Sequence, residues 1–178
     1  MRTELQPFLK SDIKELISWI RTPDELFMWS ADTFTFPLGE KQLEKHVQEA
    51  SGSGGRLMYK AVDARTKEPV GHIELTRIDR DKGKASIAYV LVDPERRGLG
   101  YGKAMIQNIL HECFDHMKLS KVDLFVFEFN TVAIQCYQSA GFQLEDVIKD
   151  RVKLNEKFVP LYLMGLNEEK WNSLKQTG

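Results

Sequence analysis

Three glycines alternate with larger residues in the stretch RRGLGYGK, residues 96–103, which also carries three cationic side chains. A glycine turn that opens a helix leaves unpaired backbone N–H groups at the positive end of the helix dipole, and such groups bind anions. Glycine also lets the backbone approach a ligand where a side chain would block it. We therefore expect this stretch to bind the phosphate groups of a ligand rather than to form a plain flexible corner.

The residues on either side of this loop predict a strand before it and a helix after it. Residues 87–92 form a short apolar run, which is typical of a strand buried on both faces. Pro94 ends that strand because proline has no amide hydrogen to give to the ladder. Beyond the loop, apolar residues recur at the spacing of a helix, at Met105, Ile106, Ile109, Leu110, Cys113 and Phe114.

Two common phosphate-binding loops do not fit this stretch. A Walker loop needs serine or threonine after its Gly-Lys pair, but Ala104 follows Lys103, and Arg97 stands where the first glycine belongs. A dinucleotide loop needs its third glycine at the position of Lys103. The spacing Arg-x-x-Gly-x-Gly, at Arg97, Gly100 and Gly102, instead resembles the acetyl-CoA loop of the GCN5-related N-acetyltransferase (GNAT) superfamily.

A second motif, Asn130-x-x-Ala133-x-x-x-Tyr137-x-x-x-Gly141-Phe142, lies further along the chain. Its spacings place Asn130, Ala133 and Tyr137 on one face of a helix. The pattern resembles the later motif of the same superfamily, in which the asparagine contacts the cofactor and the tyrosine lies near its sulfur. Asn130 could also be the helix N-cap, which is compatible with that contact, and Tyr137 could be a core aromatic residue.

The resemblance covers essentially the whole chain and implies a cofactor, a set of binding residues and a fold. The cofactor is acetyl-CoA. The implied fold is α/β (mixed α+β), with a mostly antiparallel sheet splayed between two parallel strands, here those ending at Val92 and Phe129, and with helices on both faces. Residues 1–178 would form a single N-acetyltransferase domain. The implied binding residues are Val90, Leu91, Val92, Arg97, Gly98, Leu99, Gly100, Tyr101, Gly102, Lys103, Asn130 and Tyr137.

Local signals predict the same succession of elements: a strand, helices, a three-strand meander, a helix, a strand, a helix and a hairpin, which is a mixed α/β layer fold. A helix is expected from Gly39 to Ala50, and Ser51 to Gly55 are expected to form a flexible loop. The tail from Asn167 is polar apart from Trp171, and no element is predicted there. The predicted strands are residues 3–9, 56–63, 69–78, 85–92, 122–129, 147–153 and 158–166.

Acetyl transfer to an amine requires stabilisation of the thioester oxygen and of the leaving sulfur. Tyr137 has an ordinary pKa of about 10, so it is protonated at neutral pH and can donate a proton to the sulfur. A backbone amide near Leu91 or Val92 is the expected hydrogen-bond donor to the oxygen, because the splaying of the strand frees it.

The amine must also lose a proton before it attacks, and three residues are candidates for the base. Glu74 lies inside an otherwise apolar strand, and burial would have to raise its pKa, or a water chain would have to link it to the amine. A solvated strand face or a structural ion pair is the alternative interpretation of Glu74. Glu128 and His72 are rival candidates.

The predicted reaction is acetyl transfer to a primary amine of a peptide N-terminus, a polyamine or another small amine. The first helix and the terminal hairpin are most similar to the ribosomal-protein N-terminal and polyamine acetyltransferase branch. One alternative is a catalytically silent acyl-CoA-binding sensor or scaffold module. Another alternative is an enzyme that uses the same glycine loop to bind a different phosphate-bearing ligand. The mismatch with the Walker and dinucleotide patterns argues against this alternative.

Composition excludes several other classes. A net charge of −1 over 178 residues argues against a nucleic-acid surface, and no apolar run is long enough to span a membrane. The first residues show no secretory signal, so a cytoplasmic protein with Cys113 and Cys136 reduced is expected. The four histidines lack metal-ligand spacing, so no metal is predicted. The terminal hairpin is a possible homodimer contact.

Overall fold

The computed structural model describes residues 2–177, in which seven strands form one sheet of order β1-β2-β3-β4-β5-β7-β6. Neighbouring strands are antiparallel except for the parallel pair β4 and β5. This confirms the predicted mixed, mostly antiparallel sheet. The strands are β1 (Thr3–Pro7), β2 (Leu57–Asp63), β3 (Pro69–Asp79), β4 (Lys84–Val92), β5 (Lys121–Phe127), β6 (Gln143–Leu154) and β7 (Lys157–Asn167).

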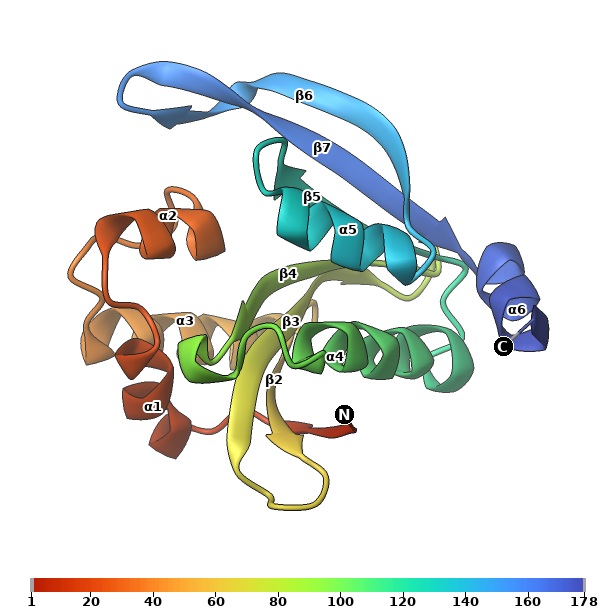
Figure 1. Ribbon diagram of the computed structural model, residues 1–178, viewed down its shortest axis with the longest axis horizontal. Coiled ribbons are helices and arrows are strands. Elements are labelled where there is room, and N and C mark those ends of the chain that lie inside the picture. The colour runs from red at the N-terminus through yellow and green to blue at the C-terminus, as the bar shows by residue number, and fades with distance from the viewer. Residues whose placement is uncertain (1, 178) are drawn as a thin grey trace.

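Helices cover both faces of this sheet (Figure 1). One apolar core lies between the sheet and α4 and α5, and a second core lies between the opposite face and α1 to α3. None of the helices in residues 2–177 has the length and apolar character needed to cross a bilayer. The helices are α1 (Ile13–Ser18), α2 (Pro23–Ser30), α3 (Glu40–Ser53), α4 (Tyr101–Leu110), α5 (Thr131–Ser139) and α6 (Glu168–Thr177), with short turns η1 (Lys10–Asp12), η2 (Pro94–Arg96) and the π-helical η3 (His111–His116).

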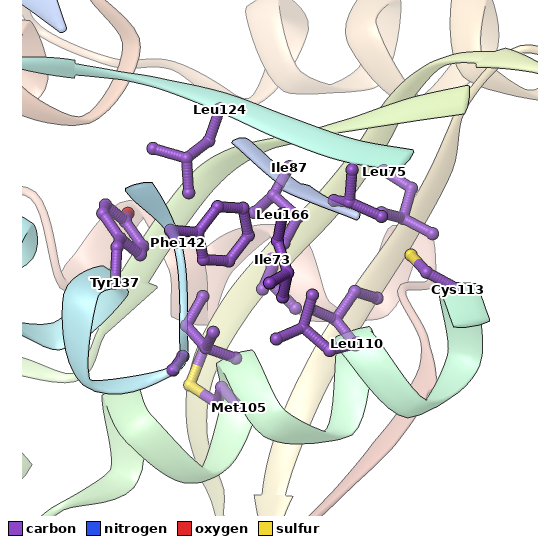
Figure 2. Packing of buried hydrophobic residues seen from close by; sticks show 14 of the residues in the cluster. Ile73, Leu75, Ile87, Met105, Leu110, Cys113, Leu124, Tyr137, Phe142 and Leu166 are labelled. Atoms are coloured by element: carbon purple, nitrogen blue, oxygen red, sulfur yellow. The ribbon is translucent and has the colours of Figure 1, made fainter. Parts of the chain in front are cut away.

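The core around α4 follows the apolar spacing seen in the sequence. Met105, Ile106, Ile109 and Leu110 are fully buried, and the stripe continues through η3 with buried Cys113 and Phe114. Figure 2 shows Met105, Leu110 and Cys113 directed from this helix toward the strand residues Ile73, Leu75 and Ile87. This packing fixes α4, and with it the glycine loop at its start, against the centre of the sheet.

One predicted loop was wrong, and one helix was not predicted. The flexible loop expected at 51–55 is largely helical, because α3 continues to Ser53, with the Ser51 hydroxyl donating to the Val47 carbonyl oxygen, and ends at the left-handed Gly54 (φ 60°). The tail after Asn167, for which no element was predicted, forms α6. Its Trp171 is buried and stacks on Phe114, so a contact distant in sequence holds this polar helix in place.

The terminal hairpin is confirmed, but its strands are longer than predicted. β6 begins at Gln143 rather than at residue 147, and β7 begins at Lys157. The two residues between the strands, Asn155 and Glu156, both have positive φ (48° and 63°), as the twist of a two-residue hairpin requires. The hairpin extends over β5 and α5 in Figure 1.

Candidate active site

Strands β4 and β5 pair over four residues and then part. Their parallel register runs from Lys84 with Lys121 to Ile87 with Leu124 and ends there. Beyond this point β4 pairs with β3, and β5 pairs with β7 as far as Phe127. The predicted splay is therefore present, although β5 ends at Phe127 rather than at residue 129.

The parting of the strands also corrects the prediction that residues 87–92 are buried on both faces. Ile87 and Leu91 are buried, but Ala88, Tyr89, Val90 and Val92 are only half-buried. In the part of the chain that the structure describes, β4 has no strand partner on the β5 side from Ala88 onward. Unpaired backbone amides and carbonyls along such an edge can hydrogen-bond an extended ligand as a neighbouring strand would.

Tyr89 forms a bulge in β4 at the start of this unpaired edge. Its φ is 50°, and the register between β3 and β4 shifts here, from His72 opposite Leu91 to Glu74 opposite Ala88. A bulge bends its strand and increases the local twist. The bulge therefore contributes to the divergence of β4 from β5.

The glycine loop enters α4 as predicted. Gly98 and Gly100 have φ values of 77° and 85°, which favour glycine, and a Cβ at either residue would have no atom within 4 Å. Gly100 is the N-cap of the ten-residue α4, so the amides of the first helical turn lack helical partners. The exposed backbone and the open space above it fit a phosphate-bearing ligand.

The side chains of this loop differ in their availability to a ligand. Lys103 is exposed and has no ion pair within residues 2–177, whereas Arg97 is half-exposed and lies 3.5 Å from Glu25 Oε1. The Tyr101 side chain is buried, and its hydroxyl donates to Asp63 Oδ2 at 2.6 Å. Of the predicted binding residues, Tyr101 could therefore contribute only its backbone, while Leu99 is 52% exposed.

The second motif lies beside the loop and β4. A Cβ placed on Gly102 would be 3.6 Å from Val92 Cγ2 and 3.9 Å from Cys136 Sγ, so α4, β4 and α5 converge at this glycine. Asn130 is the N-cap of α5, where its Oδ1 accepts from the Ala133 amide at 3.2 Å. The N-cap role expected for Asn130 is confirmed.

Tyr137 is buried on the inner face of α5, with its ring packed beside Phe142 at a centroid distance of 6.1 Å. Figure 2 shows the ring next to Leu124, the residue of β5 at which the pairing with β4 ends. Burial, and to a smaller degree the neighbouring Cys136, raises the pKa of the Tyr137 hydroxyl well above its ordinary value. The hydroxyl has no hydrogen-bond partner among residues 2–177 and is not fully enclosed, so it can donate to a ligand.

The turn after α5 holds this helix in position. The Gly141 amide donates to the Gln138 carbonyl oxygen, and the Phe142 amide donates to that of Tyr137. These two bonds, with φ of 103° at Gly141, form a Schellman motif. The glycine at the end of α5 and the packing of Phe142 on Tyr137 therefore orient the Tyr137 ring.

Glu74 is fully buried and lies on the opposite face of the sheet, against α3. His46 Nε2 lies 2.9 Å from Glu74 Oε1, His72 Nε2 lies 3.0 Å from the same oxygen, and Arg56 Nε lies 3.8 Å from Oε2. Burial acts to raise the pKa of the Glu74 carboxyl, but the hydrogen bonds from the two histidines outweigh it and lower that pKa. The elevated pKa that a base at Glu74 was expected to need is therefore absent, because each carboxylate oxygen has a close donor.

The two rival bases are placed very differently. His72 is fully buried, and its Nδ1 has no partner among the described residues. Glu128 is exposed directly after β5 and has no ion pair within residues 2–177. No group of three or more histidine, cysteine, aspartate or glutamate side chains in the described chain is placed to hold a metal ion.

His46 is a site residue that the sequence analysis missed. It falls in the helix expected from Gly39 to Ala50, in which Leu43, His46, Val47 and Ala50 follow the i, i+3, i+4, i+7 spacing of a buried face. His46 is 4% exposed. A histidine within such a stripe opposite a strand that carries glutamate is the signal that could have identified the pair.

Comparisons with known proteins agree with this geometry. The model of the acetyltransferase (GNAT) family matches residues 23–142. An uncharacterized N-acetyltransferase p20 of Bacillus licheniformis is 21% identical over 170 residues, covering 96% of this chain and 95% of that protein. Spermidine N(1)-acetyltransferase of Vibrio cholerae is 24% identical over 132 residues, covering 74% and 73%.

A solved structure has the same fold. The spermidine N-acetyltransferase of Vibrio cholerae, crystallised with CoA and spermine, superposes with a TM-score of 0.84 at 19% identity, covering 96% of this chain and 98% of that one. The family match extends from α2 through the glycine loop and β4 to the end of the second motif. The chain therefore belongs to the acetyltransferase (GNAT) family and is an acyltransferase that uses acetyl-CoA.

Proposed function

We propose that this chain transfers the acetyl group of acetyl-CoA to the primary amine of a peptide N-terminus, a polyamine or another small amine, with residues 1–178 acting as one catalytic domain. The observation that carries the proposal is the opening of β4 from β5 after Ile87 and Leu124, with the glycine loop beside it and Tyr137 next to Leu124. Bound acetyl-CoA supplies the acetyl group as a thioester whose sulfur must leave.

The loop and the unpaired edge of β4 are suited to binding and orienting this ligand. The amides of the first turn of α4 and the Lys103 ammonium would hold the phosphates. Val90, Leu91 and Val92 would bind the extended arm through their backbone, and an amide there would donate to the thioester oxygen. The Asn130 side chain, which caps α5, would contact the ligand from the other wall.

Tyr137 would be the proton donor to the leaving sulfur. Its raised pKa keeps the hydroxyl protonated at neutral pH, whereas a free thiol of the CoA type has a pKa of about 8.5 and leaves as a thiolate unless a proton is supplied. The apolar residues Phe142 and Leu124 pack in the same core as the Tyr137 ring, and such low-dielectric surroundings would strengthen a hydrogen bond from its hydroxyl to the ligand.

The acceptor side would lie where α2 meets the end of β5. Phe27 of α2 stacks on Phe127 at 4.9 Å, and Phe127 stacks on Phe129 at 5.2 Å, so the two elements form one aromatic wall. Asp32 lies two residues after the end of α2, and Glu128 follows β5 directly; both are exposed and have no ion pair within residues 2–177. These carboxylates would attract a protonated amine, which then loses its proton toward solvent.

The test has two stages. Thermal unfolding is measured with acetyl-CoA, ATP and NAD, since a ligand at 100 times its dissociation constant stabilises a protein by about 2.7 kcal/mol. Release of free thiol is then followed with spermidine, an L-amino acid and a peptide with a free N-terminus. A shift with acetyl-CoA alone, followed by thiol release with one amine class, supports the proposal. Binding without release for any amine would indicate the silent acyl-CoA-binding module instead, and no shift would overturn the site.

Assembly and location are separate predictions. A similar spermidine N-acetyltransferase structure from Vibrio cholerae is dodecameric, and we propose that this chain also self-associates, with the β6–β7 hairpin as a candidate contact. Light scattering of the purified chain would show whether it is larger than a monomer. The cytoplasmic location stays a prediction.

A further inference from the structure

The ring of Tyr89, the bulged residue of β4, is held by groups from three different elements. Its centroid lies 5.6 Å from that of Trp29 in α2 and 5.0 Å from that of His46 in α3. The guanidinium of Arg56, the residue just before β2, lies 5.8 Å from the centre of the ring. The hydroxyl of Tyr89 lies 3.2 Å from Thr33 Oγ1. The conformation of the bulge is therefore coupled to its surroundings through this side chain.

Two of these groups are in turn held by Glu74. His46 Nε2 lies within 2.9 and 3.1 Å of the two carboxylate oxygens, and Arg56 Nε lies 3.8 Å from one of them. Arg56 Nη1 also lies 3.0 Å from His46 Nδ1. The same Arg56 Nη1 lies 3.1 Å from His46 Nε2, so the guanidinium, the imidazole and the Glu74 carboxylate form one largely buried cluster.

Glu74 is also adjacent to the bulge in the sheet. It pairs with Ala88, the residue before Tyr89, and the next aligned pair is His72 with Leu91. His72 donates to Glu74 as well, at 3.0 Å, so the carboxylate links both ends of the irregular stretch. The groups that face the Glu74 carboxylate are His46, His72, Arg56 and Tyr89.

We infer that Glu74 is a positioning residue, which acts through His46 and Arg56 on the Tyr89 bulge and so sets the course of residues 90–92 along the acetyl-CoA site. Glu74 has no exposed surface and its oxygens are occupied by protein donors, so it holds structure rather than contacting the acceptor amine. This inference rests on the proposed function, because it concerns the same cofactor edge.

The test compares two ligands on the Glu74→Gln variant. The substituted amide would keep the shape of the side chain but lose the charge, and its NH2 group would face the histidine donors. We expect the dissociation constant of acetyl-CoA to rise about tenfold or more, and kcat to fall. Adenosine 3′,5′-bisphosphate, the nucleotide end of CoA, lacks the extended arm that would lie along residues 90–92 and should bind with less than about a twofold change. The pH profile of kcat/KM should keep its shape.

The alternatives give different results. Unchanged acetyl-CoA affinity with loss of the acidic limb of the pH profile would make Glu74 the base and overturn the inference. A lowered unfolding temperature with unchanged affinity and kcat would leave Glu74 with a purely structural role and would also overturn it. Failure of the wild-type chain to bind acetyl-CoA would instead refute the proposed function.

A second pair of variants keeps the inference testable if Glu74→Gln does not fold. Tyr89→Phe keeps the ring and removes only the contact with Thr33, whereas Tyr89→Leu removes the ring that His46 and Arg56 hold. We expect Tyr89→Leu to lose acetyl-CoA affinity selectively over the bisphosphate, and Tyr89→Phe to lose much less. Equal losses in the two variants would contradict the coupling. The exposed Glu95, replaced in Glu95→Gln, serves as the charge-matched control for folding.

Discussion

A Cβ placed on Gly102 would lie 3.6 Å from Cγ2 of Val92, at ordinary contact distance, in the angle between α4 and the unpaired end of β4. The same Cβ would lie 3.9 Å from Cys136 Sγ of α5. The first turn of α4 thus has room for a methyl group, but only in the space between the two walls of the proposed cofactor site.

The Gly102→Ala variant should separate stability from binding. Alanine is favoured over glycine inside a helix by about 0.5–1 kcal/mol, so the ligand-free chain should unfold at the same or a higher temperature. The added methyl group should weaken acetyl-CoA binding by about tenfold, measured by titration calorimetry. Gly39→Ala, at the N-cap of α3 where a Cβ would have no atom within 4 Å, is the control for the added methyl group and should bind normally. Wild-type affinity in Gly102→Ala would place the ligand elsewhere.

Tyr137→Phe should affect turnover far more than binding. The variant removes one hydroxyl from a buried ring and leaves the packing on Phe142 intact. General acid catalysis contributes about 10²–10⁴-fold, so thiol release should slow by about this factor, while the dissociation constant of acetyl-CoA changes less than about threefold. Tyr162→Phe, at a half-buried tyrosine of β7, is the control for loss of a hydroxyl. Equal turnover in Tyr137→Phe and the wild type would remove the proton-donor assignment.

Cys113 should react with thiol reagents only when the chain unfolds. The residue is fully enclosed, and burial raises the pKa of its thiol to about 12, so little thiolate forms in the native state below that pH. Because the folded pKa exceeds the ordinary value of about 9, this neutral thiol stabilises the fold fully below pH 9, and the contribution is lost as the pH rises toward 12. Mass spectrometry after alkylation at pH 8 should find Cys136 modified before Cys113. Equal rates would show that the core around η3 opens readily.

Asp115 should anchor α6 in a pH-dependent manner. Its Oδ1 lies 2.7 Å from Lys175 Nζ and accepts from Trp171 Nε1 at 3.2 Å, and its Oδ2 lies 2.6 Å from His111 Nδ1. The hydrogen bond from Lys175, with smaller contributions from His111 and Trp171, lowers the pKa of Asp115 to about 2, although partial burial opposes this. Because the folded pKa lies below the ordinary 3.8, the stabilisation is complete above pH 4 and is lost as the pH falls toward 2.

The Asp115→Asn variant tests this anchor. At pH 7 the unfolding temperature should fall by about 2–4 °C, which corresponds to about 1 kcal/mol in a chain of this size. The difference from the wild type should shrink as the pH is lowered from 4 to 2 in calorimetric scans. Asp150→Asn, at an exposed aspartate of β6, should show no such trend. A difference that is constant with pH would mean that packing of Trp171, and not the charge of Asp115, holds α6.

Short-range spacing in the sequence determined the parts of the site that are local. The glycines of residues 96–103 produce the turn because only glycine adopts its positive φ values without strain, and the apolar stripe from Met105 to Phe114 produces the helix behind it. The second motif likewise carries its own N-cap and C-terminal glycine. These features depend on residues a few positions apart, so periodicity and spacing predicted them.

Only the tertiary structure decided where β4 leaves β5, which buried groups pair with Glu74, and whether the polar tail folds. The pairing of His46 with Glu74 joins residues 28 positions apart, and that of Trp171 with Asp115 joins residues 56 positions apart. Their stabilisation comes from burial and hydrogen bonding between distant segments, which local spacing does not encode. For the same physical reason, the sequence did not predict the lowered pKa of Glu74. The pKa of a carboxyl group in an apolar strand rises or falls according to the partners that folding brings to it.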